Sequence, residues 1–431
     1  MTTTGIAITL LVGGFLALII LRIPIPVALM ASTAVTMMYL NLPLMTMAQQ
    51  MAKSINSFSL MAVPFFILAG EIMGAGGISD KIVAFANAIV GRFRGGLACV
   101  NCLDSMMFGG ISGSAVADVS SLGSIVVPMM EKSGYDRDFS VALTVTTSCQ
   151  GVLIPPSHNM IFFAMAAGGV SVGKLFLGGA IPGIMLGLAL MVYSLFISVK
   201  RNYPKGEAMS FKQILIVTKD GLIALFTAVI IIGGVTMGWF TATESAAIAC
   251  LYALFVSVFV YRTLKWRDMP KILGNVVRTL CLSFSLIAAA GAFGYVLAFL
   301  RVPALLTNFL LSITSNKIVL LLLVNLMLLL LGCIMDMAPI IFIVTPILLP
   351  VMTALGVDPI HFGVMMIFNL AIGLCTPPVG SALFVGCAVG KTSIERVTKE
   401  MLPMYAVMIF CLMLVTFVPA LSSWLPNLIM G

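Results

Sequence analysis

Apolar residues run in long blocks along most of this chain, separated by short polar or basic loops. A membrane-spanning helix needs about 20 apolar residues. The first blocks that meet this need are Gly5–Leu21, Ile25–Leu40 and, after a polar loop to Ser57, a stretch that ends in glycines at residues 74–77. Residues 79–94 instead alternate charged and apolar positions at helical spacing, which predicts a helix lying along the membrane surface.

The next two blocks carry breaks in their middle. Leu97–Met130 is centred on GGISGSAVAD, and each arm has too few residues to cross, so we predict a re-entrant hairpin over residues 97–132 that turns at Ser112-Gly113-Ser114. Residues 139–168 are apolar but contain GVLIPPSHN. Because proline lacks an amide donor, Pro155 and Pro156 predict a helix that unwinds within the membrane. Leu175–Val199 then completes a first half.

The same plan recurs 222 residues later. Residues 110–156 and 332–378 align without a gap, with nine of 47 positions identical, and seven of these are glycine, proline or aspartate. Such residues set backbone breaks, so the pattern of interruptions is what is duplicated. The second half is predicted to hold spans at Gly221–Trp239, 241–261, Leu280–Leu300 and Met404–Leu425, a surface helix at 302–316, a hairpin at 318–355 turning at MDMAP, and a helix at 361–390 broken at Thr376-Pro-Pro.

Two halves of this kind define the domain organisation, with residues 1–199 and 221–431 joined by a loop at 200–220. Each half has five crossings and one hairpin, and an odd number forces the halves into opposite orientations. Lysine and arginine gather in the loops at 200–220 and 262–279, which places both loops in the cytoplasm and both termini outside. We therefore predict an all-α polytopic membrane protein built as an inverted repeat.

Composition supports this class. The chain is 61% hydrophobic and 9% charged, with mean hydropathy +1.17, which excludes a soluble protein of 431 residues. Its net charge of +8 comes from short loops beside apolar blocks, so we expect no binding to nucleic acid. The start lacks a basic region and a cleavage site and predicts a retained first span. Cys99 and Cys102 alone have metal-site spacing, and we interpret them as packing residues.

The polar residues inside the apolar blocks form no catalytic grouping, so the chain is not predicted to be an enzyme. His361 is interpreted as opening a helix, whereas His158 either lines a cavity or packs. Asp118 and Asp336 are acids that a membrane centre tolerates poorly. Asp118 either has a function, orienting a hairpin tip or balancing a cation, or caps free backbone amides. For Asp336, at the second tip itself, we favour the functional alternative.

Hydroxyl groups beside the two breaks predict ion binding. Sodium prefers oxygen ligands, and an unwound helix beside Ser112, Ser114 or Thr376 offers carbonyl and hydroxyl oxygens that face each other. An anionic solute would meet the positive N-terminal ends of the half-helices that restart after each break. Glu244, in TATESAA, is interpreted as capping a helix.

Several motifs together resemble one family, the large membrane subunits of tripartite ATP-independent periplasmic (TRAP) transporters. They are PFFILAGEIM, GGISGSAVADVSSLGS, GVLIPPSHNMIFFA, FTATESAA and GLCTPPVGSALFVG. The resemblance implies an elevator-type, sodium-driven importer in the bacterial inner membrane. It also implies two partners, a small four-helix membrane subunit and a periplasmic substrate-binding protein. We expect the small subunit to be a separate polypeptide.

The resemblance also implies residue roles. About two sodium ions are expected, with ligands at the two breaks: Ser112, Ser114, Gly151, Pro155, Gly332, Asp336, Gly373, Thr376 and Pro378. Asp118 is expected to support the first tip. The substrate is expected to meet Ser112, Ser114, Ser157, Asn159, Thr376, Gly380 and Ser381. The two tips differ, SGS against MDM, so their sites are not expected to be strictly equivalent.

Substrates of the family are small carboxylates, including C4-dicarboxylates and sialic acids. The IPPSHNM segment resembles members that take sugar acids, and sialic acid is the favoured substrate. Two other classes stay open: a sodium–dicarboxylate symporter that works without a binding protein, and an anion channel. The symporter would transport alone, and the channel would pass current without saturation or sodium dependence.

Overall fold

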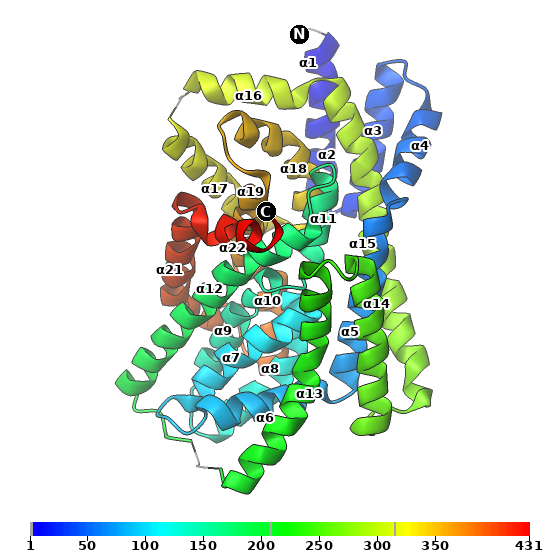
Figure 1. The fold of residues 1–431 in the computed structure, drawn as a ribbon. Helices are drawn as coiled ribbons and strands as arrows, with labels where there is room; N and C mark the ends of the chain where they lie inside the picture. Colours follow the sequence, from blue (N-terminus) through cyan, green and yellow to red (C-terminus); the bar gives the residue numbers. More distant parts are fainter. Residues whose placement is uncertain (1–2, 207–208, 314–315) are drawn as a thin grey trace.

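The computed structural model describes residues 3–206, 209–313 and 316–431, which form helices joined by short turns (Figure 1). Eight helices in this described part are long and apolar enough to cross a membrane, or nine if one bent pair is counted as a span. Two of the eight, Lys317–Ile334 and Met337–Ala354, belong to the predicted second hairpin and not to the ten predicted crossings. Ile25–Tyr39 and the pieces of the broken helices are too short to qualify.

The first half contains a span of two α-helical segments and a π-helical turn, then the elements that form the first hairpin and the first broken helix. Their bounds are α1 (Thr3–Ile8), the turn Thr9–Gly13, α2 (Gly14–Ile20), α3 (Ile25–Tyr39), α4 (Leu44–Ile55), α5 (Ala62–Ala75), α6 (Ile78–Val90), α7 (Gly96–Ser112), α8 (Ala115–Lys132), α9 (Arg137–Thr147), α10 (Gln150–Leu153), α11 (His158–Ala166) and α12 (Val172–Lys200).

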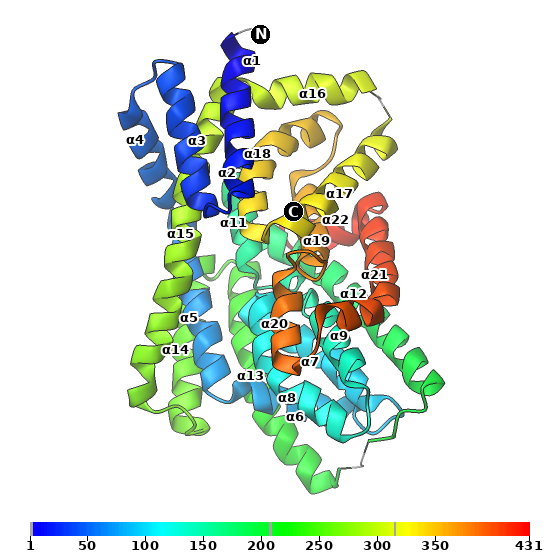
Figure 2. The ribbon, with the colours of Figure 1, turned by 180° about the vertical axis from the view of Figure 1, so that it is seen from behind.

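The second half repeats this order. Its helices are α13 (Phe211–Thr236), α14 (Ala242–Phe255), α15 (Met269–Phe299), α16 (Val302–Ile313), α17 (Lys317–Ile334), α18 (Met337–Ala354), α19 (Pro359–Leu374), α20 (Ser381–Gly390), α21 (Ile394–Phe417) and α22 (Ala420–Met430). The hairpins α7–α8 and α17–α18 lie toward opposite ends of the molecule, as do α6 and α16, which run crosswise to the long helices (Figures 1 and 2). The predicted fold class, an inverted repeat with two hairpins and two broken helices, is confirmed.

Several helices begin earlier than the hydropathy pattern predicts. The predicted polar loop before Ser57 contains α4, which packs along α15, and Ser54 lies against Gly291 there. Helix α13 begins at Phe211, ten residues before the predicted span, because Gln213 accepts a hydrogen bond from the Ser210 amide in a capping arrangement. Helix α15 begins at Met269 with Pro270 in its first turn, which is where proline is tolerated. Polar residues lower the hydropathy at these positions, so the sequence pattern did not predict where the helices begin.

The last predicted span, Met404–Leu425, is also wrong as a single helix. The chain leaves helical geometry at Val418, and the short helix α22 follows Pro419. Proline cannot donate the amide hydrogen bond that would continue α21. Helix α22 instead packs on α12. The predicted surface helix at 302–316 corresponds to α16, although residues 314–315 lie outside the described residues.

The broken helices form the centre of the molecule. Every residue of α19 after Pro359 is buried, and so are Phe139 to Thr147 in α9. The first hairpin arm α7 packs on α9 and α10, and α17 packs on α19. The hairpins and the other helices thus enclose the two breaks that the sequence singled out.

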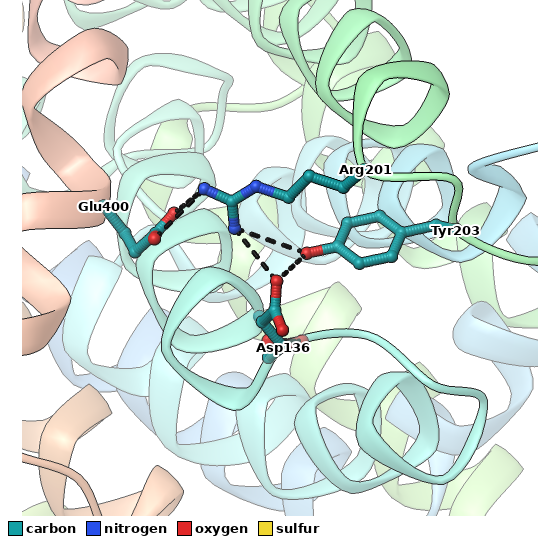
Figure 3. Close-up of polar contacts among 5 residues, drawn as sticks. Asp136, Arg201, Tyr203 and Glu400 are labelled. Carbon is teal, nitrogen blue, oxygen red and sulfur yellow. Dashed lines mark hydrogen bonds and ion pairs between the residues drawn. The ribbon is translucent and has the colours of Figure 1, made fainter.

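A polar cluster joins the loop between the halves to the helices around the two breaks (Figure 3). The Arg201 guanidinium lies 3.1 Å from an Asp136 oxygen and 2.8 Å from a Glu400 oxygen, and Tyr203 donates its hydroxyl to the same Asp136 oxygen at 2.5 Å. Burial, together with the hydrogen bond to Asp136, raises the pKa of Tyr203 to about 12. Arg201 also lies over the Phe139 ring. Residues after α12 are therefore held against α9 and α21.

Candidate functional site

The first hairpin tip faces the first break. Helix α7 ends at Ser112, Gly113 adopts a left-handed conformation with φ of 63°, and Ser114 caps α8 by accepting a hydrogen bond from the Ala117 amide. A Cβ atom on Gly113 would lie 2.7 Å from the carbonyl oxygen of Pro156. A side chain at this position would therefore clash with the break. The predicted turn at Ser112-Gly113-Ser114 is confirmed.

Oxygen atoms of the first break point toward the hairpin. A Cβ on Gly110 would lie 3.2 Å from the carbonyl oxygen of Pro155, so the carbonyls of both prolines are directed at α7 and its tip. The peptide bond between Pro155 and Pro156 is cis, and so is the one between Pro377 and Pro378 in the second half. The structure thus brings the tip serines and the Pro155 carbonyl, all expected sodium ligands, into one region.

A buried hydroxyl beside this break lacks a partner. The Ser157 side chain has no exposed surface, and its Oγ atom makes no hydrogen bond within the described part of the chain. The backbone of Ser157 lies against Gly113. Asn159, two residues on, is also buried. Because a buried hydroxyl without a partner is unfavourable, Ser157 fits a site whose occupant supplies the missing contact.

His158 lies between these two residues at the start of α11. Its ring meets the edge of Phe162 with centroids 5.6 Å apart, and its Nδ1 atom has no hydrogen-bond partner among the described residues. The side chain is therefore held mainly by packing. His361, in the first turn of α19, differs because its Nδ1 lies 2.7 Å from the hydroxyl of Ser422 in α22. The interpretation of His361 as a residue that opens a helix is confirmed.

The second tip uses an acid where the first uses a serine. Asp336 caps α18 by accepting the Met337 amide at 2.9 Å, and Ser381 donates its hydroxyl to the same oxygen at 3.5 Å. The break supplies carbonyls as well, since a Cβ on Gly380 would lie 2.8 Å from the oxygens of Leu374 and Thr376. Asp336, Gly380 and Ser381 are thus brought together, and Asp336 makes the backbone-capping bond of the alternative that the sequence did not favour.

Two other expected residues complete this second region. Thr376 donates its hydroxyl to the Ile372 carbonyl at 2.7 Å, which leaves the hydroxyl lone pairs free to accept. Pro378 is exposed. The Val379 amide bonds to the Cys333 carbonyl at 3.1 Å, so the break and the end of α17 are joined directly.

Glycine pairs hold each hairpin against its broken helix. A Cβ on Gly109 would lie 2.1 Å from the Gly151 Cα atom, and a Cβ on Gly373 would lie 2.6 Å from the Gly332 Cα atom. Only glycine allows backbones to approach this closely. The duplicated Gly151 and Gly373 therefore set the position of each tip, and in the first half the partner is Gly109 rather than Gly110, the residue aligned with Gly332.

The two regions are interleaved between the halves. The second piece of each broken helix packs on the return arm of the other half's hairpin: α20 on α8, and α11 on α18, where Phe162 and Phe342 meet. At the centre, the Cys149 and Cys375 sulfur atoms are 3.0 Å apart. Only Cys99 and Cys102 were singled out from the sequence, so this pair was not predicted. The positions of Cys149 and Cys375, two residues from Gly151 and Gly373, were the available signal.

Buried acids lie in the first hairpin. Asp118 is 1% exposed, and neither carboxylate oxygen has a hydrogen-bond partner in the described residues, so the interpretation that it caps backbone amides is wrong. Ser114 caps α8 instead. Asp104 in α7, which the sequence analysis did not single out, is fully buried and also unpartnered. An acid inside an apolar helix was the available signal.

Glu244 has the structural role that the sequence predicted. Its carboxylate accepts the Thr241 amide at 2.7 Å, and its own amide donates to the Thr241 hydroxyl, which makes a capping box at the start of α14. Cys99 and Cys102 are buried within α7.

Paired hairpins and broken helices of this kind are typical of secondary transporters. The family model described as "Tripartite ATP-independent periplasmic transporter, DctM component" matches residues 12–421. The chain belongs to this family, the large permease subunits of TRAP transporters.

Several relatives match over most of the chain, and two of them are named for different substrates. The uncharacterized protein YgiK of Salmonella typhimurium is 41% identical and covers 98% of this chain and 97% of its own length. The sialic acid TRAP transporter large permease SiaM of Vibrio cholerae is 40% identical, covering 89% and 90%. The C4-dicarboxylate permease DctM of the same species is 37% identical, covering 99% and 98%.

A solved structure shares the fold at low sequence identity. The YdaH transporter of Alcanivorax borkumensis aligns with a TM-score of 0.66 at 14% identity, covering 89% of this chain and 90% of its own. This likeness concerns the fold alone.

Proposed function

We propose that this chain imports a small carboxylate, with sialic acid the first substrate to test, and that about two co-transported sodium ions drive the import. The single observation that carries the proposal is the Ser157 hydroxyl, buried and unpartnered beside a hairpin tip. The sequence placed Ser157 among the substrate contacts, and we propose that it is a sodium ligand instead. The carbonyls of Pro155 and Pro156 face the same tip. A set of uncharged oxygen atoms around an unpartnered hydroxyl suits a hard monovalent cation.

The substrate would lie where both tips and breaks offer polar groups and helix N-termini. Helices α11 and α20 each begin just after a break, so their free amides favour an anion. Asn159 and Ser381 lie in these first turns. Two ions on one monoanion carry net positive charge inward, so uptake should be electrogenic.

As a large permease subunit of this family, the chain is expected to work with a small four-helix membrane subunit and a periplasmic binding protein. Support comes from its membership of the family. Uptake by this chain alone would favour a symporter that needs no binding protein. Current without saturation or sodium dependence would indicate a channel.

The test is sodium-driven uptake in proteoliposomes that contain this chain, its small membrane subunit and its binding protein. Labelled sialic acid is the substrate and succinate the competitor. We expect Ser157→Ala to raise the half-maximal sodium concentration about tenfold while sodium-free thermal stability stays equal or rises, because an unpartnered hydroxyl is removed.

The matched control is Ser124→Ala. Ser124 is exposed on α8 and donates to the Ser121 carbonyl of its own helix, so its loss should leave sodium dependence unchanged. Unchanged sodium dependence in Ser157→Ala, or stability lost in proportion to activity, would remove this hydroxyl from the ion site.

A further inference from the structure

A separate cavity of about 730 Å³ lies at the end of α11 that is remote from the break. Four segments distant in sequence form its wall: the end of α4, the turn from α11 to α12, the turn from α13 to α14, and Met430 near the C-terminus. None of the residues assigned to the sodium or substrate sites lines it. Since α11 has nine residues, the cavity lies roughly 13 Å from the break along the helix axis.

The charged lining of this cavity, within the described residues, is positive only. Lys53 is the single charged side chain among the lining residues in the described part of the chain, and the others are apolar, hydroxyl, amide or glycine residues. Lys53 is exposed and has no ion-pair partner among the residues described. An unpaired ammonium group in a concave site attracts anions.

Two helix N-termini add to the positive electrostatic potential in the cavity. The cavity wall includes Ser171 to Gly173, where the 29-residue helix α12 begins, and Thr241 to Thr243, where α14 begins. The first amides of a helix have no partner within the helix, and its dipole places partial positive charge there. Glu244 offsets part of this charge at α14, because its carboxylate accepts from Thr241. The α12 terminus has no acid in its first turn.

We propose that this cavity is a second anion site, a vestibule that holds a small carboxylate before it reaches the breaks. The inference rests on the proposed transport function and assigns that function a further site. Lys53 would pair with the carboxylate, while the α12 amides and the neighbouring hydroxyls would bind it further. The cavity volume lies within the range of small-molecule sites. The predicted orientation of the halves places its wall on the outer face.

Equilibrium binding of labelled sialic acid to the purified permease complex, in sodium and without the binding protein, tests the proposal. The native complex should bind two molecules per chain, one tightly and one weakly. Lys53→Gln should lose the weak class, and Lys53→Arg should restore it. In proteoliposomes, Lys53→Gln should raise the KM for uptake about fivefold with kcat unchanged, and higher salt should shrink that difference.

Arg301→Gln is the control, since Arg301 is exposed in the turn before α16 and does not line the cavity. A single binding class in the native complex, or two classes in Lys53→Gln, would overturn the vestibule while leaving sodium-driven uptake intact. Weaker uptake by Lys53→Gln only at limiting binding protein, with anion binding unchanged, would also overturn it and assign Lys53 to a protein contact. Failure of the native complex to transport in sodium would instead reject the proposed function.

Discussion

The thiols of Cys149 and Cys375 each donate to a backbone carbonyl in the opposite half of the protein. Cys149 Sγ lies 3.0 Å from the Ala371 oxygen, and Cys375 Sγ lies 3.1 Å from the Val145 oxygen. Both side chains have no exposed surface. The two broken helices are therefore joined by a reciprocal contact close to Gly151 and Gly373.

This contact predicts coupling between the two breaks. Cys149→Ala and Cys375→Ala should each lower the free energy of unfolding by about 1 kcal/mol, because a buried hydrogen bond and some packing are lost. Since the residues touch, the double variant should lose less than the sum, with an interaction energy of about 0.5–1 kcal/mol. Thermal unfolding in detergent measures these values. Strict additivity, or the same coupling between Cys149 and Cys281, which is exposed on α15, would contradict a specific contact.

The glycine pairs predict a severe effect from one added methyl group. A Cβ in Gly109→Ala would meet the Gly151 backbone at 2.1 Å, and no side chain can move aside to make room. We expect uptake to fall more than tenfold and the melting temperature to fall as well. Gly294→Ala is the matched control, because Gly294 lies inside α15 with no atom within 4 Å of its would-be Cβ. Alanine there should be neutral or stabilising. Equal behaviour of the two variants would refute the close approach.

The unpartnered Asp104 predicts a stabilising substitution. Asp104→Asn removes a buried acid that no described residue compensates, so the free energy of unfolding should rise by about 1–2 kcal/mol. Asp80→Asn, at an exposed position in the first turn of α6, should change little. Thermal unfolding with and without sodium separates the outcomes. A less stable Asp104→Asn variant that also loses sodium stabilisation would mean that a cation occupies this position in the native protein.

The cluster around Arg201 predicts that the loop between the halves is protected from proteolysis. Glu400→Gln should weaken the hold on Arg201 by about 1 kcal/mol or less, because the pair is partly exposed. Trypsin should then cleave at Lys205 severalfold faster. Glu395→Gln, on the same helix but outside the cluster, should leave cleavage unchanged. If both variants are cleaved at the native rate, the cluster does not restrain the loop.

The sequence predicted the breaks well because glycine and proline have local effects on the backbone. Ser112-Gly113-Ser114 and Thr376-Pro-Pro determine where helices end whatever surrounds them, and the duplication marked both places. It predicted helix starts less well at Phe211 and Met269, because lysine and arginine there lower hydropathy without preventing helix formation. It could not predict the Cys149–Cys375 contact or the cavity at Lys53. Both arise where segments remote in sequence meet.

The interleaving of the halves has a consequence for how the protein is made. The return arm α8 of the first hairpin rests on α20, and α20 begins roughly 250 residues after α8 ends. At a synthesis rate of about 5–20 residues per second, the first hairpin waits on the order of 10–50 s for its partner. During that time its serine-rich tip and buried acids have no second break beside them. Insertion machinery or lipid must therefore shield these polar groups of the first half until the second half has been synthesised.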